Sequence, residues 1–279
     1  MHKEESIMMH KTNAPLISVL MGVYNCASTV EESVQSILNQ TISDWELIIC
    51  EDGSTDNTLE IVKRLQHQNP DRIILLENGQ NCGLNYTLNR CLSAATGKYI
   101  ARMDGDDISL PDRLEKQAAF LNEHPDIAIV GALMDAFDES GIWGRHTYPQ
   151  NPTKADFLRT TVFGHPVTMV RREAYLSVGG YSEGKWLMRV EDFHLWMKMY
   201  AAGYIGANLQ EVLYLYRDDR NGYTKRKFRY RLNAVYVNML AVKELKLPAY
   251  LYLRSLRPLL VGLLPAGLYR LLHHLKLSH

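Results

Sequence analysis

The chain has 279 residues, of which 46% are hydrophobic and 22% are charged, and its formal net charge is zero. This length allows one large domain or a domain with an appendage, and the composition excludes global disorder and fibrous repeats. The charge is unevenly distributed, because residues 220–279 carry twelve lysines and arginines and one acid, whereas residues 1–219 carry nineteen basic and thirty acidic side chains; this suggests a charged partner for the C-terminal part.

The first predicted elements are a strand and a helix. Residues 16–25, LISVLMGVYN, form a short apolar run that is typical of a strand. Residues 27–40 carry apolar side chains at the spacing of one helix face. Ser28 and Glu31 have the spacing of a capping box, so we expect them to begin this helix.

The unit of strand and helix then repeats. Strands are predicted at residues 45–54, 72–78 and 98–104, and helices at 58–65 and 83–97. This alternation predicts βαβ crossovers and an α/β fold whose mostly parallel sheet is covered by helices on both faces. Ligands of such sheets bind beyond the carboxyl ends of the strands, where the sequences VYN, EDGS and MDGDD fall.

The second half of the chain is less regular. A helix is predicted at residues 112–124, a strand at 126–139 and an amphipathic helix at 191–203, and we assign the rest of 140–220 to the same domain. Residues 224–246 predict a basic amphipathic helix, and residues 247–279 mix leucine patches with Arg, Lys and His. The longest uncharged run there has twelve residues and two prolines, too short and broken to span a bilayer.

The cysteines and the N-terminus bear on the compartment. The four cysteines form no C-x-x-C pair and stand near no histidine at metal-ligand spacing, which argues against a zinc site and a disulfide framework. Residues 1–15 contain acids and lack the apolar segment of a signal peptide. We therefore expect a reduced, cytoplasmic location.

Three carboxylates crowd the end of the strand at 98–104. Asp104, Asp106 and Asp107 lie within four positions. A cluster of oxygen ligands suits Mg²⁺ or Mn²⁺, which also takes oxygens from a diphosphate. Taken alone, such a D-x-D sequence is more often a solvated acidic turn, so its neighbours decide between the two interpretations.

Two further acidic pairs accompany it. Glu51 and Asp52 follow the strand at 45–54 and suit either a nucleoside or a helix-capping loop. Glu191 and Asp192 begin a helix, where acids meet the helix dipole favourably and where a carboxylate could also act as general base. The sequence has no G-x-G-x-x-G and no Walker A motif, which disfavours NAD binding and P-loop chemistry.

Seven motifs together resemble a known family. They are ISVLMGVYN, EDGSTDNT, NCGLNYTLN, GKYIARMDGDD, PDRLEKQ, GHPVTMVRREAYLSVGGYSE and EDFHLWMKM. In this order they resemble the family 2 inverting glycosyltransferases of the GT-A fold, of the kind that assembles bacterial polysaccharides. The resemblance covers residues 16–217 and implies a Rossmann-like sheet with a nucleotide-sugar donor at the strand ends.

The resemblance also implies roles on the donor side. Val23 and Tyr24 are expected to border the uracil of a UDP-sugar, and Asp52 to accept from the base. Glu51 stands where the family usually has Asp. The remaining donor-side residues are Arg102 for the nucleotide, Asp104 for the ribose and the metal, and Asp106 as the ligand of Mn²⁺ or Mg²⁺.

On the acceptor side, the resemblance makes Asp192 the general base, with Glu191 orienting it or capping the helix. His165 is expected near the acceptor, although a histidine beside a proline is more often simply packed, and Trp186 is expected against a sugar face, which burial explains equally well. Arg217 matches a position that helps with the diphosphate, but Asp219 stands where the family often has His, which puts that role in doubt.

The expected organisation is a tail at 1–15, a catalytic domain at 16–220 and a basic amphipathic helical region at 221–279. Within the catalytic domain, residues 16–110 form the nucleotide half and 111–220 the acceptor half. The C-terminal region is expected to bind the anionic inner face of the cytoplasmic membrane, next to a saccharide or lipid-linked saccharide acceptor. Packing on the catalytic domain or a homodimer interface is the alternative, and nucleic acid is not expected as a partner.

Two other functions fit parts of the pattern. A sugar-nucleotide pyrophosphorylase would need a glycine-rich, basic loop near the N-terminus, and MGVYNCAST has no basic residue. A non-catalytic nucleotide-sugar-binding or membrane scaffold protein would not need Asp104, Asp106 and Asp192 together.

Overall fold

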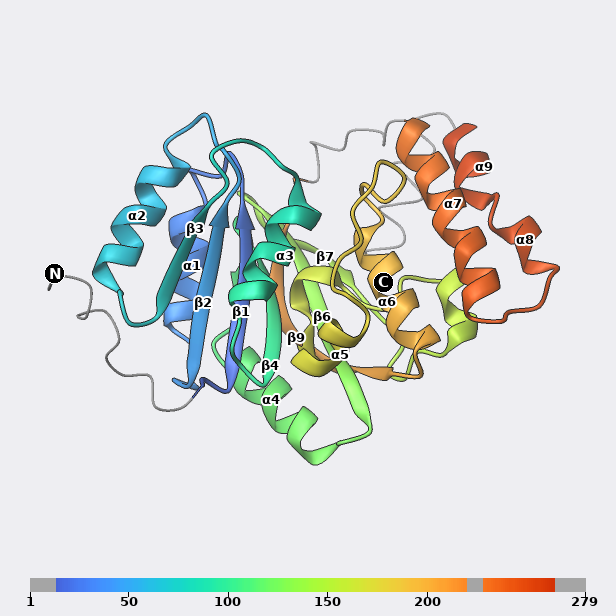
Figure 1. Ribbon diagram of the computed structural model, residues 1–279, viewed down its shortest axis with the longest axis horizontal. Coiled ribbons are helices and arrows are strands. Elements are labelled where there is room, and N and C mark those ends of the chain that lie inside the picture. Colours follow the sequence, from blue (N-terminus) through green and yellow to red (C-terminus); the bar gives the residue numbers. More distant parts are fainter. Residues whose placement is uncertain (1–13, 220–227, 264–279) are drawn as a thin grey trace, which may run out of the picture.

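The computed structural model describes residues 14–219 and 228–263. One mixed sheet runs through the molecule, and helices α7 to α9 lie together at one end (Figure 1). The strands are β1 (Ile17–Val23), β2 (Trp45–Glu51), β3 (Ile73–Glu77), β4 (Tyr99–Asp104), β5 (Ile108–Ser109), β6 (Ile127–Asp138), β7 (Gly141–His146), β8 (Met169–Arg171) and β9 (Ile205–Arg217).

The helices alternate with the strands of the first half, as predicted. They are α1 (Val30–Leu38), α2 (Thr58–Gln68), α3 (Leu84–Ala94), α4 (Arg113–Glu123), α5 (Arg172–Ser177), α6 (Glu191–Ala201), α7 (Phe228–Glu244), α8 (Leu251–Arg254) and α9 (Arg257–Leu263). Two short 3₁₀ helices are η1 (Lys154–Leu158) and η2 (His165–Val167).

The sheet has the order β3-β2-β1-β4-β8-β6-β9-β5, with β7 paired to β6. Strands β1 to β4 are parallel, which puts their carboxyl ends at one edge. Strand β8 runs antiparallel between β4 and β6, and β6 pairs in parallel with β9. The antiparallel strand therefore joins a parallel half to a mixed half.

Both faces of the sheet are covered, as expected. Along β1, Val19 and Met21 point into a core shared with α1, α2 and α4, whereas Leu20 points into a second core shared with α3, α5 and α6. Alternate residues of a strand face opposite sides of the sheet, and helices cover both sides here. Both faces of a central strand such as β1 are therefore apolar.

Helix α1 does not begin with the predicted capping box. It starts at Val30, its N-cap is Thr29, and no side chain caps it. The Thr29 hydroxyl instead donates to the carbonyl of Gly105 at 3.0 Å. The spacing of Ser28 and Glu31 was therefore misleading, because Thr29 contacts the acidic loop after β4 rather than its own helix.

Helix α7 is part of the fold. It packs against α6 and η1, and Ala241 and Val242 belong to the same core as α6. No helix in the described ranges is long and apolar enough to cross a membrane. The N-terminal residues 1–13, the basic run at 225–227 and the leucine-rich end at 264–279 lie outside the described residues.

Candidate active site

A cavity of ≈ 550 Å³ opens at the carboxyl ends of β1 and β2. Its walls come from three segments: the end of β1 with Asp52, the start of α3, and the loop before α6. The lining residues are Gly22, Val23, Tyr24, Asp52, residues 81–87, Glu183, Gly184, Lys185, Met188, Arg189 and Glu191. Of the site residues predicted from sequence, Val23, Tyr24, Asp52 and Glu191 thus lie around one cavity.

Asp52 is buried and holds the start of α3. Its Oδ1 accepts from the Asn78 amide at 2.7 Å and from the Cys82 backbone N–H at 2.8 Å, and its Oδ2 accepts from the Gly83 N–H at 2.9 Å. A carboxylate has about four acceptor sites, so one lone pair remains for a ligand. Asp52 is therefore an anchor of the cavity wall as well as a candidate nucleoside contact.

Glu51 is buried and turned into its own loop. Its carboxylate accepts from the backbone N–H groups of Gly53 at 3.1 Å and Ser54 at 2.5 Å. These bonds fix the tight turn in which Gly53 has a φ of 71°, a conformation that favours glycine. Glu51 does not line the cavity.

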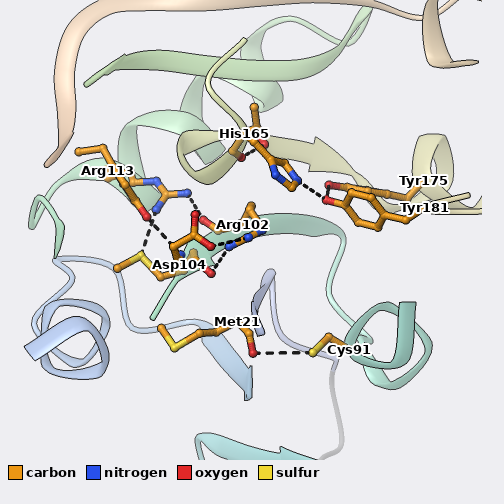
Figure 2. A network of polar contacts seen from close by, with 11 residues as sticks. Met21, Cys91, Arg102, Asp104, Arg113, His165, Tyr175 and Tyr181 are labelled. Carbon is orange, nitrogen blue, oxygen red and sulfur yellow. Dashed lines mark hydrogen bonds and ion pairs between the residues drawn. The ribbon is translucent and has the colours of Figure 1, made fainter. Parts of the chain in front are cut away.

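Arg102 is buried, and Figure 2 shows it beside Asp104. The two residues are i and i+2 on β4, and the guanidinium Nη2 donates to Asp104 Oδ1 at 2.5 Å. Burial opposes the charge of the guanidinium, but Asp104 and the phenols of Tyr181 and Tyr214 more than offset this, so the Arg102 pKa lies above its ordinary value. In this geometry Arg102 holds the Asp104 carboxylate, and Arg102 itself does not line the cavity.

A second buried arginine, Arg113, lies on the other side of the same strand end. It donates to the Arg102 carbonyl at 2.6 Å, and its guanidinium lies 5.0 Å from the Tyr214 ring. Burial lowers the pKa of Arg113 to about 10. The Tyr214 hydroxyl accepts from the Asp104 backbone N–H at 3.2 Å, so this cluster also fixes the strand end.

The three aspartates have different environments. Asp107 is fully buried and accepts from the Arg217 backbone N–H at 2.7 Å. Burial, followed by the charges of Asp104 and Asp106, raises the Asp107 pKa well above its usual range. Asp106 is exposed, and partial loss of solvent together with Asp104 raises its pKa. Arg217 donates from Nε to the Asp106 carbonyl at 2.7 Å, so it fixes the loop rather than the carboxylate.

The acidic loop, residues 104–107, provides some of the oxygen ligands that a hard cation needs. Asp106 is exposed, so its carboxylate oxygens are available, while one oxygen of Asp104 accepts from Arg102. Within the described ranges, no group of three His, Cys, Asp or Glu side chains could hold a metal ion. Asp104 and Asp106 offer two oxygen ligands, and Mg²⁺ or Mn²⁺ would take its remaining ligands from diphosphate and water.

Glu191 and Asp192 form the first turn of α6. Glu191 lines the cavity, and burial together with Asp192 raises its pKa. Burial, followed by Tyr175, raises the Tyr181 pKa well above its ordinary value, and half-buried Asp192 adds to this shift. Asp192 itself does not line the cavity.

His165 is part of a buried polar chain. Its Nε2 lies 2.7 Å from the Tyr181 hydroxyl, which is 3.2 Å from the Tyr175 hydroxyl (Figure 2). Burial and the nearby Arg102 charge hold the pKa of the His165 imidazole well below its usual range. A neutral imidazole in this position can exchange hydrogen bonds but carries no charge toward a phosphate.

Trp186 lies on the outer side of the loop before α6. It is 46% exposed, and its ring centroid lies 6.0 Å from that of Tyr236 in α7. Its ring does not line the cavity. The predicted contact of Trp186 with a sugar therefore remains a prediction.

Comparison with known proteins identifies the family. The family model described as Glycosyl transferase family 2 matches residues 18–194. The chain belongs to glycosyl transferase family 2. As a glycosyltransferase it is 42% identical to the putative glycosyltransferase EpsE of Bacillus subtilis over 94% of each chain. It is 32% identical to the amylovoran biosynthesis glycosyltransferase AmsE of Erwinia amylovora, covering 76% of this chain and 80% of that one. These two relatives are thus a putative glycosyltransferase and a glycosyltransferase of amylovoran biosynthesis.

Solved structures confirm the fold. Residues 1–349 of Staphylococcus aureus TarS, in complex with UDP-GlcNAc, superpose with a TM-score of 0.67 at 17% identity, covering 90% of this glycosyltransferase and 76% of that TarS chain. The mannosyltransferase PcManGT from Pyrobaculum calidifontis, in complex with GDP-Man and Mn²⁺, has a TM-score of 0.66 at 21% identity, with 98% and 82% covered. The predicted α/β glycosyltransferase fold is confirmed.

Proposed function

We propose that this glycosyltransferase moves one sugar from a UDP-sugar to a hydroxyl of a saccharide acceptor, itself lipid-linked, during assembly of a cell-surface polysaccharide such as capsule, O-antigen or exopolysaccharide. The observation that carries the donor proposal is the cavity that joins Val23, Tyr24 and Asp52 on one wall to Glu191 on the other. The UDP-GlcNAc complex of TarS and the polysaccharide-assembling relatives support it.

In the proposed reaction, Asp192 takes the proton of the acceptor hydroxyl as that oxygen attacks the anomeric carbon. The new carbon–oxygen bond forms on the face opposite the leaving diphosphate, whose bond breaks, so the configuration inverts. An α-linked donor therefore yields a β-linked product. Glu191, one residue earlier, orients Asp192 at the start of α6.

The acidic loop is the proposed place for Mn²⁺ or Mg²⁺. Asp106 would bind the ion directly, and Asp104 would bind it or its water while Arg102 fixes its side chain. When bound, the ion neutralises charge on the leaving diphosphate. The chain's own contribution is to hold the loop, through the bonds of Arg217 to the Asp106 carbonyl and the Asp107 carboxylate.

The test is release of UDP from a panel of UDP-sugars, with GDP-mannose as the competing donor class and with Mn²⁺ added or chelated. Asp106→Ala and Asp192→Asn should each lower kcat at least about a hundredfold, the usual contribution of such groups. Asp126→Asn, an exposed acid before β6, is the matched control. Activity that survives both substitutions contradicts the assigned roles, and turnover of GDP-mannose alone contradicts the UDP donor.

We also propose that the C-terminal helices bring the enzyme to the anionic cytoplasmic face of the membrane as a peripheral protein. The support is a set of exposed apolar side chains on α8, α9 and their flanks: Tyr250, Tyr252, Leu253, Leu256 and Leu260. Arg254 and Arg257 lie among them, and basic residues near anionic headgroups contribute about 1 kcal/mol each.

Flotation with phosphatidylglycerol vesicles tests this surface. Leu253 is 77% exposed, so Leu253→Asp should reduce vesicle binding without unfolding the protein. Leu176→Asp, on α5 and 49% exposed, is the control that should keep binding. Equal binding by wild type and Leu253→Asp contradicts the membrane proposal, and concentration-dependent dimerisation lost in Leu253→Asp favours a homodimer instead.

A further inference from the structure

The loop of residues 183–189 forms one wall of the donor cavity. Glu183, Gly184, Lys185, Met188 and Arg189 all line it. The loop has no regular structure of its own and leads directly into Glu191. Its position therefore depends on what it contacts outside the cavity.

Arg189 shows that the loop is held in place. Its φ is 65°, in the left-handed region that a residue with a side chain rarely adopts. Such a conformation is unfavourable and persists only where surrounding contacts impose it. The contacts of the loop on its outer side are thus expected to be specific.

These contacts come from one stripe of α7. Asn233 donates from Nδ2 to the carbonyl of Met188 at 3.0 Å and to that of Lys185 at 3.4 Å. Residues 229, 233 and 236 follow the i, i+4, i+7 spacing of one helix face. Arg229 Nη2 lies 3.0 Å from the Met188 sulfur, and the Tyr236 ring packs on Trp186 of the loop.

Asn233 is an unusual residue for a packing position. It is 1% exposed, and its Oδ1 has no hydrogen-bond partner among the described residues. Leaving a buried amide oxygen unpaired is unfavourable, so leucine would pack better at this position if α7 only covered the core. What the Asn233 amide provides, and leucine could not, is the two hydrogen bonds to the 183–189 loop.

We infer that Asn233 is a positioning residue for glycosyl transfer. It holds the 183–189 loop in the conformation that completes the donor cavity, and Tyr236 supports it through Trp186. The inference rests on the proposed donor site. It makes α7 a part of the catalytic unit, although its sequence resembles a surface-binding helix.

The experiment uses the full chain with Asn233→Leu, Tyr236→Ser and Tyr236→Phe. Asn233→Leu should raise the KM for the UDP-sugar that wild type turns over, and the Kd of UDP with Mn²⁺, about tenfold, while kcat changes less. A tenfold change corresponds to about 1.4 kcal/mol. Trypsin should also cleave after Lys185 or Arg189 several-fold faster, as mapped by mass spectrometry.

Two comparisons separate positioning from general destabilisation. Asn238→Leu makes the same change five residues later on α7, at a half-buried site, and should leave KM and cleavage unchanged. Tyr236 is 42% exposed, so Tyr236→Ser should fold normally and still raise KM, whereas Tyr236→Phe, which keeps the ring, should restore the wild-type value.

The outcomes are distinguishable. Wild type that releases nucleotide from no UDP-sugar refutes the proposed donor. Wild-type activity with unchanged KM in both Asn233→Leu and Tyr236→Ser refutes the positioning role. Faster cleavage with unchanged KM and UDP affinity also overturns it, because the loop would then be attached to α7 without serving the cavity.

Discussion

Replacing Asp52 by asparagine should lower the stability of the fold as well as the affinity for nucleotide. The carboxylate is 4% exposed and accepts three hydrogen bonds, two of them from backbone N–H groups at the start of α3. Asparagine keeps one oxygen, loses the negative charge at the helix N-terminus and turns its own N–H₂ toward a backbone N–H.

The magnitude follows from these contacts. A hydrogen bond to a charged group contributes about 1.5–3 kcal/mol, and a charge near a helix N-terminus about 0.3–1 kcal/mol. Losing one such bond and weakening two others should therefore reduce the free energy of unfolding by roughly 3 kcal/mol. For a protein of this size, that lowers the melting temperature by roughly 5 °C.

Urea unfolding and thermal melting of Asp52→Asn measure this loss, and Asp126→Asn, an exposed acid, is the matched control. UDP binding is measured separately, at a temperature where the variant is folded. A variant as stable as wild type refutes the reasoning that Asp52 anchors α3. Lower stability with unchanged UDP affinity refutes its contact with the nucleoside.

Three further expectations follow from other parts of the molecule. Because burial and Arg102 lower the pKa of His165, the unfolded chain binds a proton below about pH 6.5 that the folded chain does not, so stability falls on acidification by up to about 1.4 kcal/mol per pH unit. His165→Asn should flatten this dependence in urea unfolding at pH 7 and pH 5, whereas exposed His67→Asn should keep it. Gly131→Ala should cost about 2–3 kcal/mol in the same assay, because its methyl group would lie 2.1 Å from Asn208 Oδ1; an unchanged midpoint contradicts this. Cys82 is exposed and lines the cavity, so UDP should slow its alkylation, and equal rates with and without UDP contradict the proposed site.

Much of the nucleotide half could be predicted from the sequence. Strands β1 to β4 are apolar runs followed by helices with an apolar face, and both patterns are local. Strand β9 was missed because polar residues of NLQE interrupt it and its pairing with β6 contains register shifts. Strand β8 has three residues, too few for a periodic pattern, and only its neighbours β4 and β6 define it.

Val23, Tyr24, Asp52 and Glu191 lie around one cavity, and the roles given to them remain predictions. The nucleotide role of Arg102 also remains a prediction, and in the structure its buried guanidinium is bonded to Asp104. The spacing of Arg102 and Asp104 was a usable signal, since i and i+2 of a strand share a face. Nothing local to Asp107 indicates that it accepts from Arg217, and nothing in the pattern of α7 separates Asn233 from its surface neighbours. Those contacts depend on chain segments brought together only by the tertiary fold.

The hydrogen bonds of Arg217 to Asp106 and Asp107 limit how short a fragment of this enzyme can be while keeping an ordered acidic loop. The family match ends at residue 194, but the residue that fixes Asp107 stands 110 positions after it, at the end of β9. A fragment ending near His194 would lose the parallel partner of β6, expose that strand's unpaired edge and release the acids. The smallest portion expected to keep an ordered acidic loop therefore extends past Arg217, which makes the domain boundary a property of strand pairing rather than of sequence similarity.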